Sequence, residues 1–191
     1  MNRKTALKRI VLLTTGLVAA AGGVKLYQAY KKPGLVNLDD YQKLIDELAD
    51  VIIPRTNTPG AKDVGVGDFI INMVKDCCSR QNQNSFIQGL GDLEAYVKDK
   101  YNRTFVACTI DEKIAVMKYF QNKSKNNNGT IAKASRKVLG DPFFWILKKY
   151  TLIGYCTSLN GATMALQYDY VPGKYIGSIA IKNEQKGWAT R

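Results

Sequence analysis

The residue types that most often carry out chemistry are scarce in this 191-residue chain. It contains no histidine, so the commonest general base and the commonest protein metal ligand are both missing. A Cys-x-x-Cys-His haem attachment and any nucleophile paired with histidine are excluded within the chain for the same reason. Four cysteines are present, and no Cys-x-x-Cys pair indicates a zinc or iron–sulfur site: Cys77, Cys78, Cys108 and Cys156.

Other patterns that could indicate an active site are equally weak. The acidic pairs at 39–40, 46–47 and 111–112 fall on expected polar helix faces or caps, where no apolar surroundings would raise a carboxyl pKa for acid–base work. The glycines around 60–67 follow no strand, so they are no dinucleotide fingerprint. Ser158 lies in TSLNG, which is not the Gly-x-Ser-x-Gly turn of a serine hydrolase. The sequence therefore predicts a binding function before a catalytic one.

The residues most suggestive of binding are aromatic and lie near the C-terminus. Tyr168, Tyr170 and Tyr175 are closely spaced in a segment rich in glycine and proline. Tyrosine combines an apolar ring with a polar tip, and it is enriched at protein interfaces. We therefore expect a docking surface here.

The elements that must position these residues are helices. Apolar residues recur at helical spacing, which predicts helices near 37–53, 66–79, 85–100, 109–122 and 142–158. Thr109 and Glu112 have the spacing of a capping box. Asp141 is expected to be the N-cap of the apolar, central last helix, with Pro142 at the first helical position. Residues 122–129 are expected to form a surface loop. The sequence predicts an all-α fold: a single compact helical domain of about five to six helices with an irregular C-terminal tail.

The N-terminus resembles an export signal. Basic residues are followed by fifteen residues without a charge, from Ile10 to Val24, which is short for a membrane-spanning helix of about 20 residues. The order of Arg3, Lys4, Leu7 and Lys8 is similar to a degenerate twin-arginine motif, an address read by a receptor on a route that carries folded proteins. An ordinary secretory signal and an uncleaved anchor are the alternatives.

These patterns divide the chain into three parts. We expect a twin-arginine-like signal over residues 1–24, a tether over 25–36 and a helical domain over 37–191. Seven of the 28 Lys and Arg residues lie in residues 1–32, where no acid occurs, so the remainder carries 21 basic against 16 acidic residues. That excess is ordinary for a soluble surface, and no basic cluster is interleaved with aromatics as in a nucleic-acid groove. We therefore expect no nucleic-acid partner.

Two blocks of sequence resemble a known family. LIDELADVIIPRTNTPGAKDVGVGDFI (44–70) and GYCTSLNGATMALQYDYVPGKYIG (154–177) are similar to the small subunit, also called subunit 3 or gamma, of gluconate 2-dehydrogenase complexes. The shared features are Ile-Pro-x-Thr-x-Thr-Pro-Gly-Ala at 53–61 and Gly-Ala-x-x-Ala-Leu-x-Tyr-Asp-x-Val-Pro-Gly at 161–173.

The resemblance implies a partner and no reaction in this chain. It implies a large FAD-dependent subunit of the glucose–methanol–choline oxidoreductase class, a cytochrome c subunit in some systems, and a non-catalytic small subunit. That small subunit would escort the folded, FAD-loaded flavoprotein through the twin-arginine translocase to the periplasm, where association with the membrane is a further expectation. No cofactor is expected in this chain. The substrate, whether gluconate, glucose or another sugar or polyol, stays open.

The expected partner interface combines the C-terminal tail with the last helix. Cys156, inside the second block, is expected at this surface, where it could form an intersubunit disulfide after export. The alternative function is a free-standing exported helical module that binds another protein. The full set of expected interface residues is Cys156, Tyr168, Tyr170, Pro172 and Tyr175.

Overall fold

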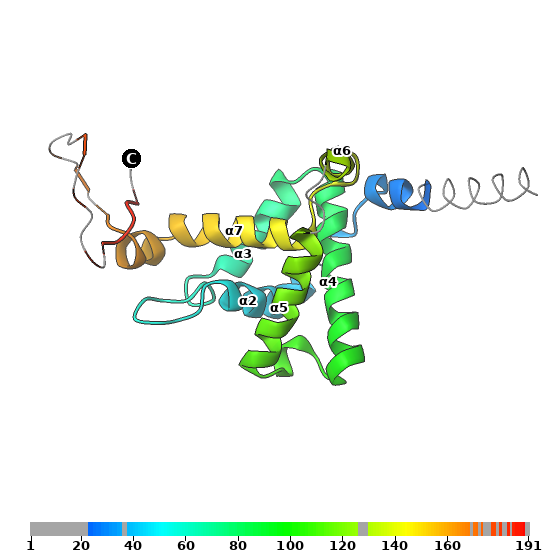
Figure 1. Cartoon of the computed structure of the whole chain (residues 1–191), viewed down its shortest axis with the longest axis horizontal. Helices are drawn as coiled ribbons and strands as arrows, with labels where there is room; N and C mark the ends of the chain where they lie inside the picture. Colours follow the sequence, from blue (N-terminus) through cyan, green and yellow to red (C-terminus); the bar gives the residue numbers. More distant parts are fainter. Residues whose placement is uncertain are drawn as a thin grey trace, which may run out of the picture.

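The computed structural model describes residues 23–35, 38–125 and 130–168, together with 170, 171, 173, 177, 178, 180, 183 and 185–189 of the tail; of residues 130–134 it describes the backbone. The secondary-structure elements within these ranges are helices, apart from one isolated β-bridge, and the predicted all-α fold is confirmed. Figure 1 shows the long α4 (Arg80–Tyr101) and α5 (Ile110–Lys125) side by side, with α7 (Phe143–Thr157) crossing them near one end.

The remaining elements pack around this frame. A 3-10 turn, η2 (Asp39–Tyr41), leads into α2 (Gln42–Ile52), and α3 (Val66–Asn72) continues as the π-helical η3 (Met73–Cys77). A second 3-10 turn, η4 (Phe105–Ala107), joins α4 to α5, while α6 (Thr130–Leu139) lies against α4. After α7, the π-helical η5 (Gly161–Ala165) begins the tail.

The core lies where α7 meets four other helices. α7 packs against α2, α3, α4 and α5, as expected from its almost continuous apolar sequence. Phe86 on α4 and Phe120 on α5 each lie against the ring of Phe143 at the start of α7, with ring centroids 5.3 and 6.1 Å apart. Burial of such side chains, each worth about 1.5–3 kcal/mol, holds α7 across the bundle.

Most predicted helices are present, and the capping box is confirmed. The Glu112 side chain accepts a hydrogen bond from the Thr109 backbone nitrogen at 2.8 Å, and the Thr109 hydroxyl accepts one from the Glu112 nitrogen. Within α5, Val116, Met117 and Phe120 are buried, whereas Ile114 is exposed.

α4 begins five residues earlier than predicted. Its first turn is rich in Gln and Asn, which gave it the composition of a loop, but two of these side chains are buried and bind backbone oxygens. The Gln83 amide donates to the carbonyl oxygens of Val74 and Lys75 at 3.1 and 2.9 Å. Ser79 supplies the N-cap, accepting from the Asn82 nitrogen.

The region between α5 and α7 also differs from prediction. α5 continues to Lys125, and α6 follows where no helix was predicted. The Asp141 side chain does not cap α7: the cap residue is Pro142, whose carbonyl oxygen accepts from Trp145 and Ile146. Asp141 is instead held by its backbone, because its nitrogen donates to Asn82 and its carbonyl oxygen accepts from Ser85.

The tail after η5 folds back on itself. Gln167 forms an isolated β-bridge with Trp188, through hydrogen bonds to Gly187 and Ala189 of 2.8 and 2.9 Å. In the part of the chain that the structure covers, no helix has the length and apolar character needed to cross a bilayer.

Candidate partner-docking surface

The predicted interface residues that the structure describes are exposed. Cys156 is exposed near the end of α7, and the exposed fractions of Tyr168 and Tyr170 are 45% and 85%. The other predicted residues lie outside the described positions: Pro172 and Tyr175 of the interface, and Arg3, Lys4, Leu7 and Lys8 of the signal.

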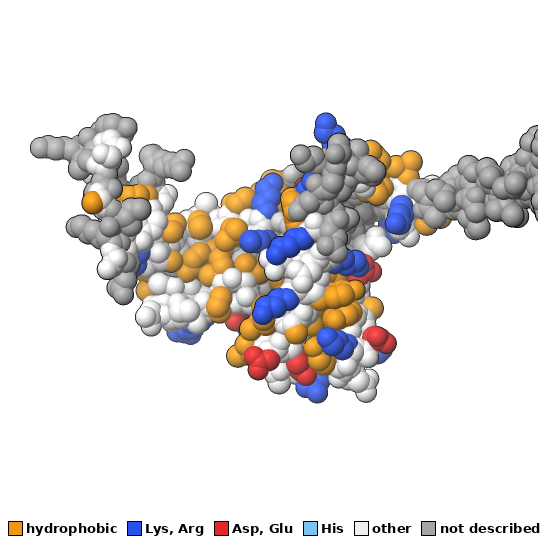
Figure 2. All heavy atoms as spheres, in the orientation of Figure 1, with side chains coloured by type: hydrophobic (Ala, Val, Ile, Leu, Met, Phe, Trp, Pro, Cys, Tyr) orange, Lys and Arg blue, Asp and Glu red, His pale blue; other side chains and the backbone are white. Residues whose placement is uncertain are grey.

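α7 also presents an apolar outer face that sequence analysis missed. Trp145, Leu152 and Cys156 follow one another at intervals of seven and four residues, which places them on one side of the helix. All three are exposed, and so are Ile153 beside them and Leu159 just beyond the helix. Figure 2 shows hydrophobic side chains gathered over the outer part of α7.

This outer face was missed because α7 is apolar nearly all round. Its buried face carries eight residues, from Phe143 to Tyr155, so apolar periodicity could not distinguish the face that meets solvent. The signal that could have done so is the lysine pair at 148–149, three and four residues after Trp145. Both lysines are exposed and flank the apolar face.

The two sequence blocks, far apart in the chain, meet at this end of the molecule. The Tyr155 hydroxyl on α7 donates to the Pro59 carbonyl oxygen at 2.8 Å. Gly154 lies so close to α3 that a Cβ there would be 2.6 Å from a ring carbon of Phe69. The loop between α2 and α3 and the start of α3 therefore lie against the last turns of α7, as Figure 1 shows.

The loop between α2 and α3 is closed by backbone and carboxylate contacts. The Ala61 nitrogen donates to the Ile53 carbonyl oxygen at 2.9 Å, and the Gly60 nitrogen donates to the Asp63 carboxylate at 2.9 Å. A side chain at Gly60 would meet the Asp50 carboxylate at 2.7 Å and the Arg55 nitrogen at 2.8 Å. Glycine at this position is thus required by the close approach of α2.

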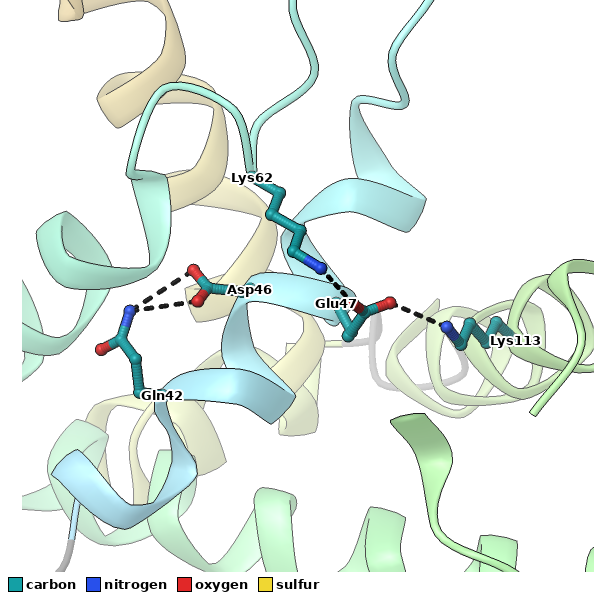
Figure 3. Close-up of polar contacts among 5 residues, drawn as sticks. All are labelled: Gln42, Asp46, Glu47, Lys62 and Lys113. Carbon is teal, nitrogen blue, oxygen red and sulfur yellow. Dashed lines mark hydrogen bonds and ion pairs between the residues drawn. The ribbon is translucent and has the colours of Figure 1, made fainter. Parts of the chain in front are cut away.

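A carboxylate of α2 ties this loop to the bundle. Figure 3 shows Glu47 between Lys62 of the loop and Lys113 of α5, at 2.5 and 2.7 Å. Hydrogen bonds from Lys113 and then Lys62 lower the pKa of Glu47. The neighbouring Asp46 accepts from Gln42, at 3.3 Å. Burial raises the pKa of Asp46, so the expectation that no carboxyl of the acidic pairs has a raised pKa is wrong.

The cysteines are placed as thiols of low reactivity or as surface groups. Cys78 is half-buried, 3.3 Å from the Tyr150 hydroxyl, and burial raises its pKa. Burial also raises the pKa of Cys108, and a raised pKa leaves less nucleophilic thiolate. Cys77, at the end of η3, is exposed. Among the described residues, no three His, Cys, Asp or Glu side chains gather closely enough to hold a metal ion.

Comparison with known families finds a match that spans most of both blocks. The family described as gluconate 2-dehydrogenase subunit 3 matches residues 39–173, which is more than half of the chain. The chain belongs to the gluconate 2-dehydrogenase subunit 3 family. No curated protein and no solved structure matches it.

Membership of the subunit 3 family bears on the surface in two ways. A subunit implies partner subunits in a complex, so an exposed apolar face is expected on such a chain. The matched range contains the α2–α3 loop, the whole of α7, and the tail through Tyr168 and Tyr170. We call the outer face of α7, with Cys156, Leu159, Tyr168 and Tyr170, the docking surface.

Proposed function

We propose that this chain is the non-catalytic small subunit of an exported FAD-dependent dehydrogenase that oxidises gluconate or a related sugar. It docks on the flavoprotein subunit through the docking surface and escorts that subunit through the twin-arginine pathway. The observation that carries the proposal is the exposed apolar face of α7, joined to the loop of the first block, in a member of a family of subunits.

The apolar character of the docking surface supports a large and stable contact. Leu152 is 42% exposed and Leu159 is 80% exposed, and contiguous apolar groups of this kind mark interaction sites on soluble proteins. The flanking Lys148 and Lys149 are exposed, and the partner is therefore expected to place acidic groups around an apolar centre.

The residues present in this chain support assigning the chemistry to other subunits of the complex. A histidine-free chain whose Cys78 and Cys108 thiols have raised pKa values is poorly equipped for acid–base or nucleophilic catalysis. We assign FAD and the sugar substrate to the large subunit, and electron acceptance to a cytochrome c subunit where one exists. This chain then supplies contacts and the export signal.

The export role is supported by the leader sequence. Arg3, Lys4, Leu7 and Lys8 precede the uncharged stretch that begins at Ile10, and a signal read by the twin-arginine translocase passes folded cargo. A flavoprotein that binds FAD in the cytoplasm requires such a route. We place the mature complex in the periplasm, in association with the membrane.

Export is tested in cells that produce the flavoprotein with three versions of this chain: the wild type, none, and the Arg3→Gln/Lys4→Gln variant. With the wild type, FAD-loaded flavoprotein should be recovered from the periplasm. Without the chain it should stay in the cytoplasm, and with the variant it should stay there bound to this chain. Recovery of FAD-loaded flavoprotein from the periplasm in all three strains would contradict the escort role.

A further inference from the structure

The segment before the family match has an unusual charge. The first acidic residue of the chain is Asp39, so seven Lys and Arg residues precede any carboxylate. Three of these, Lys25, Lys31 and Lys32, lie in or next to a helix over residues 23–30. This helix projects from α4 on the side away from the end of α7, as Figure 1 shows in blue.

The helix is fixed to the body at its C-terminal end. The Asn84 side chain, which is buried on α4, donates to the carbonyl oxygens of Ala29 and Lys31, both at 2.9 Å. These are carbonyl groups that the end of a helix leaves without an intrahelical partner. Ala29 is buried beneath them. The first part of the segment expected as a tether is thus held in a set direction.

The rest of the helix is exposed, and its side chains sort by face. Lys25, Gln28 and Ala29 line a cavity of about 390 Å³ against α4, α5 and α6. Helical spacing places Tyr27 and Tyr30 on the opposite side, where they are 73% and 49% exposed. Val24 and Leu26 beside them are exposed as well: four large side chains of this short segment have no cover in the structure.

This combination of residues fits a lipid surface better than a protein surface. Exposed tyrosines and short apolar side chains next to lysines are the composition of the bilayer interface, where aromatic rings lie at headgroup level. A segment with three lysines and no acid complements anionic headgroups. The helix also directly continues the uncharged stretch from Ile10 to Val24, which is the most apolar part of the N-terminal sequence.

We propose that residues 23–32 contact the anionic surface of a membrane, with Tyr27 and Tyr30 at headgroup depth and Lys31 and Lys32 near the phosphates. Asn84 fixes this contact relative to the bundle. The last turns of α7, which carry the C-terminal part of the docking surface, lie at the other end of the molecule (Figure 1), so the chain can bind the membrane and a partner there at the same time. The contact belongs to described residues and does not require that the leader be retained or removed.

Vesicle binding tests the charge part of the proposal. The purified full-length chain is sedimented with phosphatidylcholine vesicles and with vesicles that also contain phosphatidylglycerol, at low and high salt. We expect binding that needs phosphatidylglycerol and falls with salt. The Lys31→Gln/Lys32→Gln variant should bind about 25-fold more weakly, from roughly fivefold per lysine near a charged surface.

A charge-matched variant provides the control. Lys43 and Lys98 are exposed elsewhere on the bundle, and changing both to Gln removes the same charge. This control variant should keep near wild-type binding. Equal binding by the wild type and both variants, or an equal loss in both, would overturn the proposal, because binding would then come from the leader alone or from net charge.

Quenching by brominated lipid tests the depth of the tyrosines. In the Tyr27→Trp variant, the added tryptophan fluorescence should be quenched by lipids brominated near the headgroup. A Tyr119→Trp variant, at an exposed position of α5, should not be. Absence of quenching at position 27 would show that the outward face meets a protein or solvent, and the lipid contact would be rejected.

Discussion

At the scale of single residues, Glu47 has a larger part in stability than its position on a helix surface suggests. It is the common acceptor for Lys62 of the α2–α3 loop and Lys113 of α5, and the side chains of Glu47 and Lys113 are only 18% and 13% exposed. The contact joins three segments that are distant in sequence. By contrast, Lys75 pairs at 2.7 Å with an Asp39 side chain that is 66% exposed.

We expect Glu47→Gln to lower the free energy of unfolding by about 1–3 kcal/mol, because hydrogen bonds from two ammonium groups lose their charged acceptor. The matched change Asp39→Asn, at an exposed pair, should cost less than about 1 kcal/mol. Urea unfolding of both variants measures this. Equal losses of unfolding free energy in the two variants would mean that the partial burial of Glu47 adds nothing to stability.

The same residue predicts a pH dependence. The pKa of Glu47 is lowered in the folded protein, so its ionised form stabilises the fold above the usual pKa of 4.5. That contribution is lost as the pH falls through the folded pKa. The difference in unfolding free energy between wild type and Glu47→Gln should therefore shrink below about pH 4.5. If this difference in unfolding free energy stays constant below about pH 4.5, the ionised Glu47 carboxylate is not the source of the stabilisation.

Cys156 reports directly on the docking surface. It is exposed on α7, and Cys77 is an exposed thiol on η3. We expect a thiol-alkylating reagent to label both in the isolated chain and to label only Cys77 in the complex with the flavoprotein. Protection that persists after mild reduction indicates burial, whereas protection lost on reduction indicates an intersubunit disulfide. Unchanged labelling of Cys156 in the complex would remove it from the interface.

At the scale of elements, the sequence pattern identified helix ends that local residues determine. It missed helical turns that depend on contacts with residues distant in the sequence. The Thr109 cap is local, and it was predicted correctly. The first turn of α4 was missed because its polar residues, such as Gln83, bind carbonyl oxygens of a segment eight or nine residues away. α6 was missed although Gly140, with φ of +91°, follows directly after it, where glycine commonly ends a helix.

Two glycines of α4 test how closely it packs on α7. A Cβ at Gly89 would lie 2.2 Å from the Phe143 Cβ, whereas one at Gly91 meets nothing within 4 Å. Gly89→Ala should destabilise the protein by more than about 2 kcal/mol through overpacking. Gly91→Ala should stabilise it by up to about 1 kcal/mol through helix propensity. Thermal unfolding measures both, and similar effects of the two changes would refute the close contact.

The outer face of α7 gives a prediction for partner binding. Leu152→Asp puts a charge at the centre of the docking surface, where burial without a partner is costly. We expect affinity for the flavoprotein to fall at least about tenfold while the unfolding midpoint of the isolated chain stays near wild type. Ile110→Asp, at the exposed start of α5 away from α7, is the control and should bind normally. Equal binding by both variants would exclude this face.

At the scale of the whole molecule, the sequence was sufficient for the fold class and the family, and it was insufficient for the surface. The joining of two blocks about ninety residues apart, through Tyr155 and Pro59, depends on tertiary packing that no local pattern reports. For the same reason, the sequence could not show which side of α7 is exposed. The expected tail residues Tyr168 and Tyr170 are exposed, but their role in binding stays a prediction.

The central claim is that this chain is the docking subunit of a flavoprotein. The most direct measurement is to co-produce this chain with an FAD-dependent dehydrogenase encoded by a neighbouring gene. The product is purified through a tag on this chain, and its visible absorption spectrum is recorded. The account predicts a co-eluting large subunit with flavin absorption from the wild type, and much less of both from Leu152→Asp. A colourless, monodisperse single chain from the wild type would contradict it and favour the free-standing binding module.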